Sequence, residues 1–339
     1  MSRKKSIISL LIFLIIFIFT YKILFQGQDI NSICNAVKKA GWIYTASASL
    51  LGVFYVSMEG VMIWYLLCSM KEKTSVFHCI QYSFIGFFYS AITPSATGGQ
   101  PVQLYYMSKD GIKGSHSTVT LMTVAVAYKL VLVLIGIGLL LFWYTPLRYY
   151  LNNYFFLYIV GLLVNVVVVA FVLAVMLHPD FIISCSKRIV SFLANIGIIK
   201  NKSKCIMKIE EFVESYKQAV DFLKVQYKKL SCILLMTFVQ RCSMFLILYI
   251  VYLGFNLNTV SFTTIFCFQA AIYVTVDMLP IPGAQGITEL VYKSVFTGLF
   301  MNCLIPSMLI SRAANFYILF IISILVVLYK HIKQSFVVE

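Results

Sequence analysis

Ionisable side chains inside long apolar segments are the residues of this chain best suited to chemistry. Glu59, Lys129, Arg241 and Arg312 each lie within such a segment. A charged group is costly inside a bilayer, and where one occurs it usually serves a function. Two interpretations follow. These side chains bind a ligand that carries both kinds of charge, or they pair with one another, for example Glu59 with Arg241, and only hold the helices together.

Two segments rich in proline and glycine interrupt apolar runs and contribute further candidates. The first covers residues 93–101 and the second residues 279–286. Proline removes a backbone donor and glycine permits non-helical dihedral angles, so each segment must break a helix. Irregular backbone is tolerated at membrane depth only where protein or a water-filled cavity surrounds it. The residues predicted to bind a ligand there are Pro94, Gly98, Gly99, Gln100 and Gln103 at the first break, and Asp277, Pro280, Pro282, Gly283, Gly286 and Glu289 at the second.

A short helix is predicted to restart after each break, and Pro101 suits the first turn of one of them. The free N–H groups at a helix N-terminus carry partial positive charge and favour anions such as phosphate. Together with Lys129, Arg241 and Arg312 they suit a phosphodiester. Glu59 and the acidic residues at the second break suit a cationic group. The sequence therefore predicts a site for a zwitterionic or cationic phospholipid headgroup.

Motifs for enzymatic catalysis are absent from the sequence. It contains no nucleophile elbow, P-loop, metal-ligand pair or dinucleotide fingerprint. The nine cysteines form no CxxC motif and share no spacing with the four histidines. We therefore expect no catalytic residue, no metal ion and no cofactor.

The elements that position the candidate residues must cross a membrane. Of the 339 residues, 61% are apolar and only 12% are charged, and the mean hydropathy is +0.91. Soluble domains have about 45–50% apolar and about 25% charged residues, so this composition excludes a soluble globular enzyme. A helix needs about 20 apolar residues to cross a bilayer. Six runs reach this length: 7–25, 42–70, 117–143, 154–177, 230–254 and 305–329.

The distribution of Lys and Arg predicts the orientation. With residue 1 inside, the segments on the cytoplasmic side carry 19 Lys and Arg residues and the external segments carry 3. Cytoplasmic loops of membrane proteins are enriched in these residues. No small-residue cleavage site follows the first apolar run, so that run is expected to stay in the protein. Both termini are thus expected in the cytoplasm, and the net charge of +15 requires no nucleic acid.

The two interrupted segments are predicted to be re-entrant hairpins, because each must enter and leave on one side to keep this orientation. The order helix, hairpin, helix occurs at 42–143 and, inverted, at 230–329. Paired broken segments in inverted repeats point to a binding site near the middle of the membrane, although the match could also be chance. The predicted fold is an all-α polytopic membrane protein, one membrane domain over residues 1–339. It has six full spans and two hairpins, or eight spans if each hairpin counts as one.

Residues 178–229 form the one sizeable polar segment. Apolar residues at alternating spacings of three and four predict an amphipathic helix with one apolar stripe. The stripe consists of Ile206, Ile209, Val213, Tyr216, Val220, Leu223 and Tyr227. We expect it to pack on the same protein or to lie on the cytoplasmic membrane surface, rather than to bind a partner helix.

The two interrupted segments resemble the signature segments of the lysylphosphatidylglycerol synthase transmembrane family. The first, TPSATGGQPVQLYY, covers residues 93–106, and the second, LPIPGAQGITE, covers residues 279–289. Order, spacing and the intervening polar helix fit over nearly the whole chain. The chain departs from many relatives at Gln103, where they have Arg, and at Ala284, where they have Gly. These differences bear on the headgroup more than on the fold.

The resemblance implies a protein of the bacterial plasma membrane. In full-length members a C-terminal domain transfers lysine from lysyl-tRNA to phosphatidylglycerol. Their membrane half then moves the product to the outer leaflet, which reduces the binding of cationic antimicrobial peptides. This chain ends at Glu339 after its last apolar run. It is therefore expected to translocate lysylphosphatidylglycerol or a similar phospholipid without catalysing the transfer alone.

Two alternatives remain at this point. One is phosphatidylglycerol lysyltransferase activity with a separate aminoacyl-transfer protein, and the other is transport of another lipid-linked substrate, such as a polyprenyl-phosphate sugar. The partners considered are the phospholipid, the membrane, that separate protein and a second copy of the chain. No nucleic acid is expected to bind directly.

Overall fold

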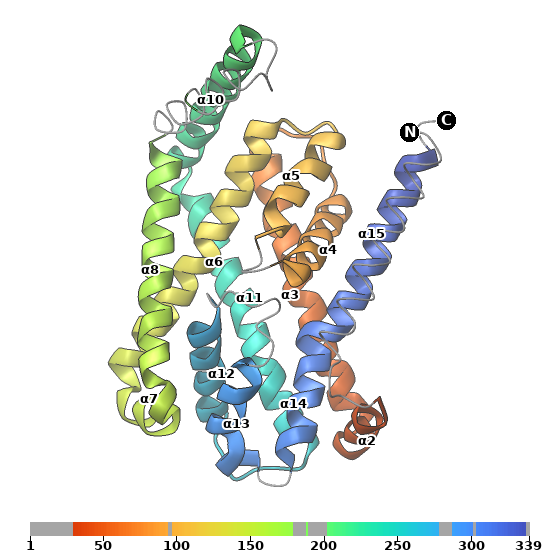
Figure 1. Ribbon diagram of the computed structural model, residues 1–339, viewed down its shortest axis with the longest axis vertical. Helices are drawn as coiled ribbons and strands as arrows, with labels where there is room; N and C mark the ends of the chain where they lie inside the picture. Colours follow the sequence, from red (N-terminus) through yellow and green to blue (C-terminus); the bar gives the residue numbers. More distant parts are fainter. Residues whose placement is uncertain are drawn as a thin grey trace.

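The described part of the chain is built of α-helices (Figure 1). The computed structural model describes residues 30–93, 97–178, 188, 202–277, 287–300 and 303–336, and these ranges contain no β-strand. The prediction of an all-α polytopic membrane protein is confirmed. The helices are α2 (Ile30–Ala40), α3 (Trp42–Ser69), α4 (Val76–Ile92), α5 (Gly99–Lys109), α6 (Gly114–Phe142), α7 (Tyr144–Leu151), η2 (Asn152–Tyr154), α8 (Phe155–Leu177), α10 (Lys202–Val225), α11 (Tyr227–Gly254), α12 (Phe262–Val276), α13 (Ile287–Phe300), α14 (Leu304–Arg312), the π-helical turn η5 (Ala313–Tyr317) and α15 (Ile318–Phe336).

Five of the six predicted spans are present as long apolar helices. They are α3, α6, α8, α11 and the helix that α14, η5 and α15 form together. At 1.5 Å per residue the 28 residues of α3 extend about 42 Å, more than the roughly 30 Å of the hydrocarbon core. The first predicted span, 7–25, lies outside the described residues.

Four shorter helices form two pairs where the hairpins were predicted. α4 and α5 lie in the half of the molecule that carries α10, and α12 and α13 lie in the opposite half (Figure 1). With 17 and 11 residues, α4 and α5 extend about 26 Å and about 17 Å, so neither crosses the membrane on its own. The two pairs thus lie in opposite halves of the molecule, and their assignment as re-entrant hairpins stays a prediction. The inverted repeat itself, 42–143 and 230–329, stays a prediction.

Two short helices lie in segments that were assigned to the external side. These helices, α2 and α7, lie at the end of the molecule opposite α10 (Figure 1). α2 buries Ala36 and Ala40, and α7 buries Leu147 and Leu151. In each helix the two residues are four apart and share one face, which packs on the transmembrane helices. This packing stabilises the two short helices, which the composition of these segments did not indicate.

The apolar stripe of α10 packs on the same chain, as predicted. α10 lies against α6, and Val213, Tyr216, Val220 and Leu223 are buried. Tyr227, which was predicted to continue the stripe, instead begins α11 and is 68% exposed. The stripe is therefore shorter than the sequence indicated.

Glycines allow α3 to pack closely against two neighbours. A Cβ atom on Gly52 would lie 2.2 Å from the carbonyl oxygen of Ala314, and one on Gly60 would lie 2.5 Å from the Cα of Ile80. Both contacts are with backbone atoms that no rotamer change can move. Small residues are commonly found where membrane helices approach this closely.

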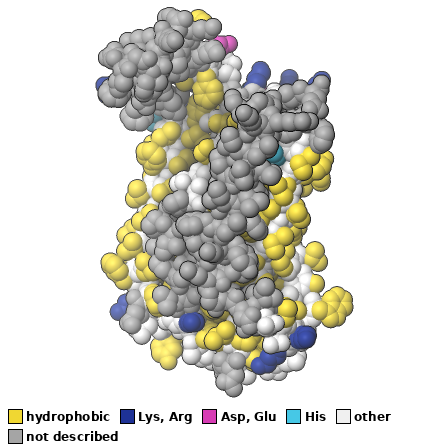
Figure 2. Space-filling view, turned by 45° about the vertical axis from the view of Figure 1, so that its right-hand side comes forward, with side chains coloured by type: hydrophobic (Ala, Val, Ile, Leu, Met, Phe, Trp, Pro, Cys, Tyr) yellow, Lys and Arg dark blue, Asp and Glu magenta, His cyan; other side chains and the backbone are white. Residues whose placement is uncertain are grey.

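On the described part of the surface in Figure 2, hydrophobic side chains lie along the sides of the molecule, whereas Lys and Arg gather toward its two ends. Leu141, Phe156 and Phe171 are each at least 65% exposed. A soluble protein rarely exposes large contiguous apolar surface. This surface supports a multi-pass membrane location.

Candidate functional site

A cavity of about 560 Å³ lies where the hairpins meet the long helices. Small-molecule sites commonly enclose roughly 300–1,000 Å³. Residues of both hairpins and of α3, α6, α8 and α14 line it. Six of the predicted site residues are among them: Glu59, Gln100, Gln103, Lys129, Asp277 and Arg312.

The first polar group of the cavity joins α3 to α5. Gln103 Nε2 donates a hydrogen bond to Glu59 Oε1 at 2.8 Å. Gln103 is only 2% exposed, and its amide occupies the space beside Gly86 of α4, where a Cβ atom would lie 2.3 Å from Nε2. Within the described residues this amide is the one hydrogen-bond partner of Glu59, which forms no ion pair there. The carboxyl group therefore retains capacity to accept further hydrogen bonds.

The second polar group joins α6 to the end of α12. Lys129 Nζ pairs with Asp277 Oδ2, and Tyr128 Oη donates to Asp277 Oδ1 at 2.8 Å. The side chain of Asp277 is 7% exposed and that of Lys129 is 18% exposed. Both carboxylate oxygens of Asp277 thus have a partner, unlike those of Glu59.

Arg241 lies behind the cavity wall. It is fully buried on α11, with its guanidinium carbon 3.1 Å from the centre of the Tyr128 ring and 5.3 Å from that of Tyr55. Its three side-chain nitrogens have no hydrogen-bond partner among the described residues. Both rings line the cavity. Arg241 therefore contacts the cavity wall through the faces of two aromatic rings, which attract its charge, and is not itself a lining residue.

Arg312 stands next to a break in helical regularity. The turn η5 follows it directly, and Asn315 within this turn also lines the cavity. A π-helical turn is often found at functional sites. Asn315 Oδ1 is buried and has no hydrogen-bond partner in the described part of the chain. The turn therefore adds Asn315 to Ser311 and Arg312 of α14, which also line the cavity.

The helix that follows the first break begins at the cavity. α5 starts at Gly99 after an N-cap at Gly98, and Pro101 is its third residue, as predicted for a first turn. A Cβ atom on Gly99 would lie 2.7 Å from the carbonyl oxygen of Gly86. Gly99 therefore lets α4 and α5 close into a tight pair, which brings Gln100 to the cavity wall.

The remaining predicted residues do not contribute described side chains. Glu289 lies in the first turns of α13, but its side chain is outside the described part of the structure. The structure does not pair Glu59 with Arg241, as one interpretation of the sequence had it. Glu59 accepts a hydrogen bond from Gln103, and Arg241 stacks on Tyr128. The residues that lie outside the described ranges are Pro94, Pro280, Pro282, Gly283 and Gly286.

Tyrosine and amide side chains that the sequence reasoning missed complete the cavity wall. Tyr55 and Tyr273 each lie one helical turn before a predicted acidic residue, Glu59 and Asp277 respectively, and Gln269 lies one turn further back. Residues four apart share a helix face. The four-residue spacing from a charged residue could have indicated that these side chains line the cavity. A tyrosine within an apolar run, however, is equally typical of the protein core.

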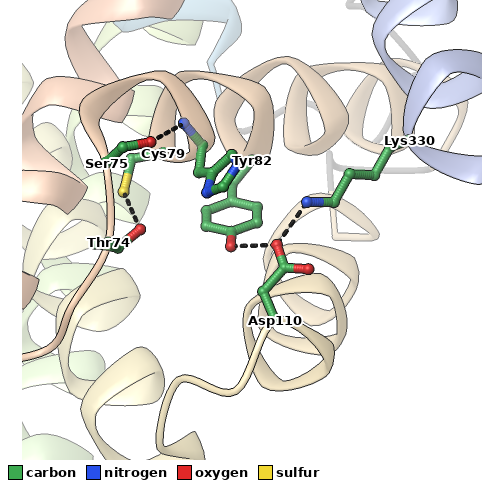
Figure 3. Close-up of polar contacts among 7 residues, drawn as sticks. Thr74, Ser75, Cys79, Tyr82, Asp110 and Lys330 are labelled. Atoms are coloured by element: carbon green, nitrogen blue, oxygen red, sulfur yellow. Dashed lines mark hydrogen bonds and ion pairs between the residues drawn. The ribbon is translucent and has the colours of Figure 1, made fainter. Parts of the chain in front are cut away.

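A second polar cluster lies around Asp110, directly after α5 (Figure 3). Tyr82 Oη donates to Asp110 Oδ2 at 2.6 Å, and Lys330 Nζ of α15 lies 2.5 Å from the same oxygen. The ammonium group also lies 5.4 Å from the centre of the Tyr82 ring. This cluster ties the first hairpin to the last helix and is not part of the cavity wall. Across the described ranges, no three His, Cys, Asp or Glu side chains are grouped to hold a metal ion.

Comparison with known proteins gives two findings. The sequence model of the family described as "Lysylphosphatidylglycerol synthase TM region" matches residues 6–323. A UPF0104 membrane protein of Archaeoglobus fulgidus is 26% identical to the chain over 91 residues. This alignment covers 27% of the chain and 28% of the relative, so the chain spans less than a third of that relative's length.

Proposed function

Because the chain belongs to the lysylphosphatidylglycerol synthase transmembrane family, we propose that it moves lysylphosphatidylglycerol, or a similar aminoacylated phospholipid, to the outer leaflet of a bacterial plasma membrane. A more cationic outer leaflet binds cationic antimicrobial peptides less, so the chain would confer resistance to them. The proposal has both termini in the cytoplasm. It is supported by the 19 Lys and Arg residues of the segments assigned to that side, against 3 in the external segments.

The observation that carries the proposal is that carboxyl groups and cations surround one cavity at the two hairpins. Glu59 faces it from α3, while Lys129 and Arg312 face it from α6 and α14. The lysylphosphatidylglycerol headgroup has a phosphodiester and ammonium groups. In the proposed complex Lys129 and Arg312 bind the phosphodiester, and Glu59 binds an ammonium group.

The helix N-termini at the two breaks are proposed to strengthen phosphate binding. α5 begins at the cavity, and α13 begins after the second break. Their first N–H groups supply partial positive charge. The residues of the second break and Glu289 keep their predicted role in this proposal.

An apolar wall is proposed to guide the acyl chains. Val168 and Val172 of α8 line the cavity and are partly exposed. The acyl chains would leave the cavity beside them and stay in the lipid while the headgroup is inside. This arrangement avoids the cost of moving the chains through a polar site.

The test is a lipid analysis of cells with and without this gene. Lysylphosphatidylglycerol is measured in the total extract and, with an amine reagent that does not cross membranes, in the outer leaflet. Unchanged total lipid with reduced outer-leaflet lipid supports translocation. Loss of the total would instead favour synthesis by this chain with a separate aminoacyl-transfer protein, and no change in either would mean another lipid-linked cargo.

Point variants connect this result to the cavity. Lys129→Met in the complemented strain should reduce outer-leaflet lipid while the protein remains at normal abundance in the membrane. Lys224→Met is the matched control, because Lys224 is exposed on α10 and pairs only with Asp221 among the described residues. Equal lipid display in the two variants would contradict a role for the cavity.

A further inference from the structure

The two acidic residues known to line the cavity have different partners. Asp277 is neutralised by Lys129 and also accepts a hydrogen bond from Tyr128. Among the described residues Glu59 has only the neutral amide of Gln103. The charge of Asp277 is therefore compensated, whereas within the described ranges that of Glu59 is not compensated by an ion pair.

An ionised carboxylate removed from water is costly unless it is paired, whereas the protonated acid is tolerated. The Gln103 amide suits both forms, since it can donate to a carboxylate oxygen or to the carbonyl oxygen of the acid. Arg241 does not provide a pair, because its guanidinium lies against the Tyr128 ring. Glu59 can thus hold a proton or a cationic group of a ligand, and each excludes the other.

We propose that Glu59 exchanges a proton for the cationic group of the cargo, so that one proton crosses the membrane in the direction opposite to each cargo molecule. This inference rests on the proposed translocation function. As the ammonium group enters the cavity, the O–H bond of Glu59 breaks, the proton passes to water on that side, and the carboxylate pairs with the ammonium group. When the cargo leaves on the other side, the carboxylate takes a proton from water there, and the site returns uncharged at Glu59.

Among the described groups around the cavity, Glu59 is the one suited to exchange a proton for a cation. Lys129 neutralises Asp277 and keeps two further N–H donors for the phosphodiester, and the guanidinium of Arg312 is a fixed cation. Arg241 likewise stays charged behind the wall. The charged and titratable side chains that surround the cavity with Glu59 are Tyr55, Tyr128, Lys129, Tyr273, Asp277, Tyr292 and Arg312. A phenol group is uncharged at neutral pH, so the tyrosines add no charge to the cavity.

The test uses the full chain in vesicles that contain lysylphosphatidylglycerol, with the impermeant amine reagent as the probe of leaflet distribution. A pH gradient is imposed while a potassium ionophore clamps the membrane potential. With one proton exchanged per cargo, the steady-state ratio between the leaflets should shift about tenfold per pH unit, toward the acidic side. Phosphatidylglycerol, which has no ammonium group, should not respond to the gradient.

Three variants isolate the carboxyl group. Glu59→Gln cannot release a proton and should lose the gradient response. Glu59→Asp keeps the acid and should retain the response at a lower rate. Glu211→Gln, the same change at an exposed position on α10, should behave as the natural chain. Thermal unfolding in detergent establishes that each variant is folded.

A fourth variant supplies the missing cation. Gln103→Lys would pair permanently with Glu59 and fix its charge, so the gradient response should disappear although the carboxyl group is present. If the natural chain moves the lipid equally with and without the gradient, or if Glu59→Gln keeps the response, the exchange is wrong and translocation stands. If the natural chain moves no lysyl lipid, both proposals fail for this cargo.

Discussion

Lys330 Nζ lies 2.5 Å from Asp110 Oδ2 although 220 residues separate them in the chain. The contact joins α15 to the end of α5, and Tyr82 of α4 shares the same carboxylate oxygen. The side chain of Lys330 is 7% exposed and that of Asp110 is 25% exposed, so water screens this pair only in part. Both helices of the first hairpin are thus fixed to the last helix at one point.

Breaking this contact should loosen the last helix. Lys330→Met leaves the Asp110 charge without its cation, which should lower the free energy of unfolding by about 1–3 kcal/mol. Thermal unfolding in detergent measures the loss. The double variant Lys330→Met/Asp110→Asn removes the unpaired charge and should recover part of it. If the double variant lost more free energy of unfolding than the two single variants lose together, this account would be contradicted.

Close packing at Gly52 gives a second prediction. Gly52→Ala would place a methyl group 2.2 Å from the Ala314 carbonyl oxygen, so α3 and η5 must move apart. Overpacking of this kind costs about 1–3 kcal/mol. Gly138→Ala on α6 is the matched control, because nothing lies within 4 Å of the added atom and alanine favours a helix. Similar melting temperatures for the two variants would show that the contact is not rigid.

Gly86→Ala tests the Gln103–Glu59 bond without altering either residue. The new methyl group would lie 2.3 Å from Gln103 Nε2 and 2.9 Å from its Cγ, so the buried side chain must shift and its amide must leave Glu59. We expect a loss of stability of about 1–3 kcal/mol, together with slower translocation, because the amide no longer orients the Glu59 carboxyl group. Lipid display in vesicles and thermal unfolding, measured together, separate the two effects. A large loss of stability with normal display would contradict the prediction.

The ring of Tyr128 and its hydroxyl group have separable roles. Tyr128→Phe keeps the aromatic face against Arg241 and removes only the hydrogen bond to Asp277, which should cost about 0.5–1.5 kcal/mol. Tyr128→Leu also removes the cation–π contact of a desolvated guanidinium, a further loss of about 2 kcal/mol. Thermal unfolding of both variants gives the comparison. Equal stability would mean that the ring does not stabilise the buried charge of Arg241.

Much of the fold could be predicted from the sequence because a bilayer tolerates few alternatives. A long apolar run must be a helix, and proline with glycine at 93–101 and 279–286 must interrupt one. The short helices α2 and α7 could not be predicted in this way. Their apolar residues do recur at helical spacing, but helices of 11 and 8 residues are marginal on their own and depend on packing against the rest of the protein.

The cavity was predictable only in part. Charged residues such as Glu59 and Lys129 stand out in an apolar run, so their place in the wall followed from the cost of burying them. The placement of Arg241 behind Tyr55 and Tyr128 did not follow, since tyrosine serves equally as core, as hydrogen-bond donor and as a face for a cation. Which of these roles it takes depends on contacts between helices far apart in the chain.

The π-helical turn η5 sets the rotational phase of everything after it. Each residue of an α-helix turns the chain by about 100°, so the one extra residue in the turn rotates α15 by that angle relative to an uninterrupted helix. Deleting a single residue there would carry Lys330 away from Asp110 and turn the exposed face of Ile321 and Leu325 inward. Helix length, counted in single residues, is therefore as strict a constraint on this protein as the identity of its charged side chains.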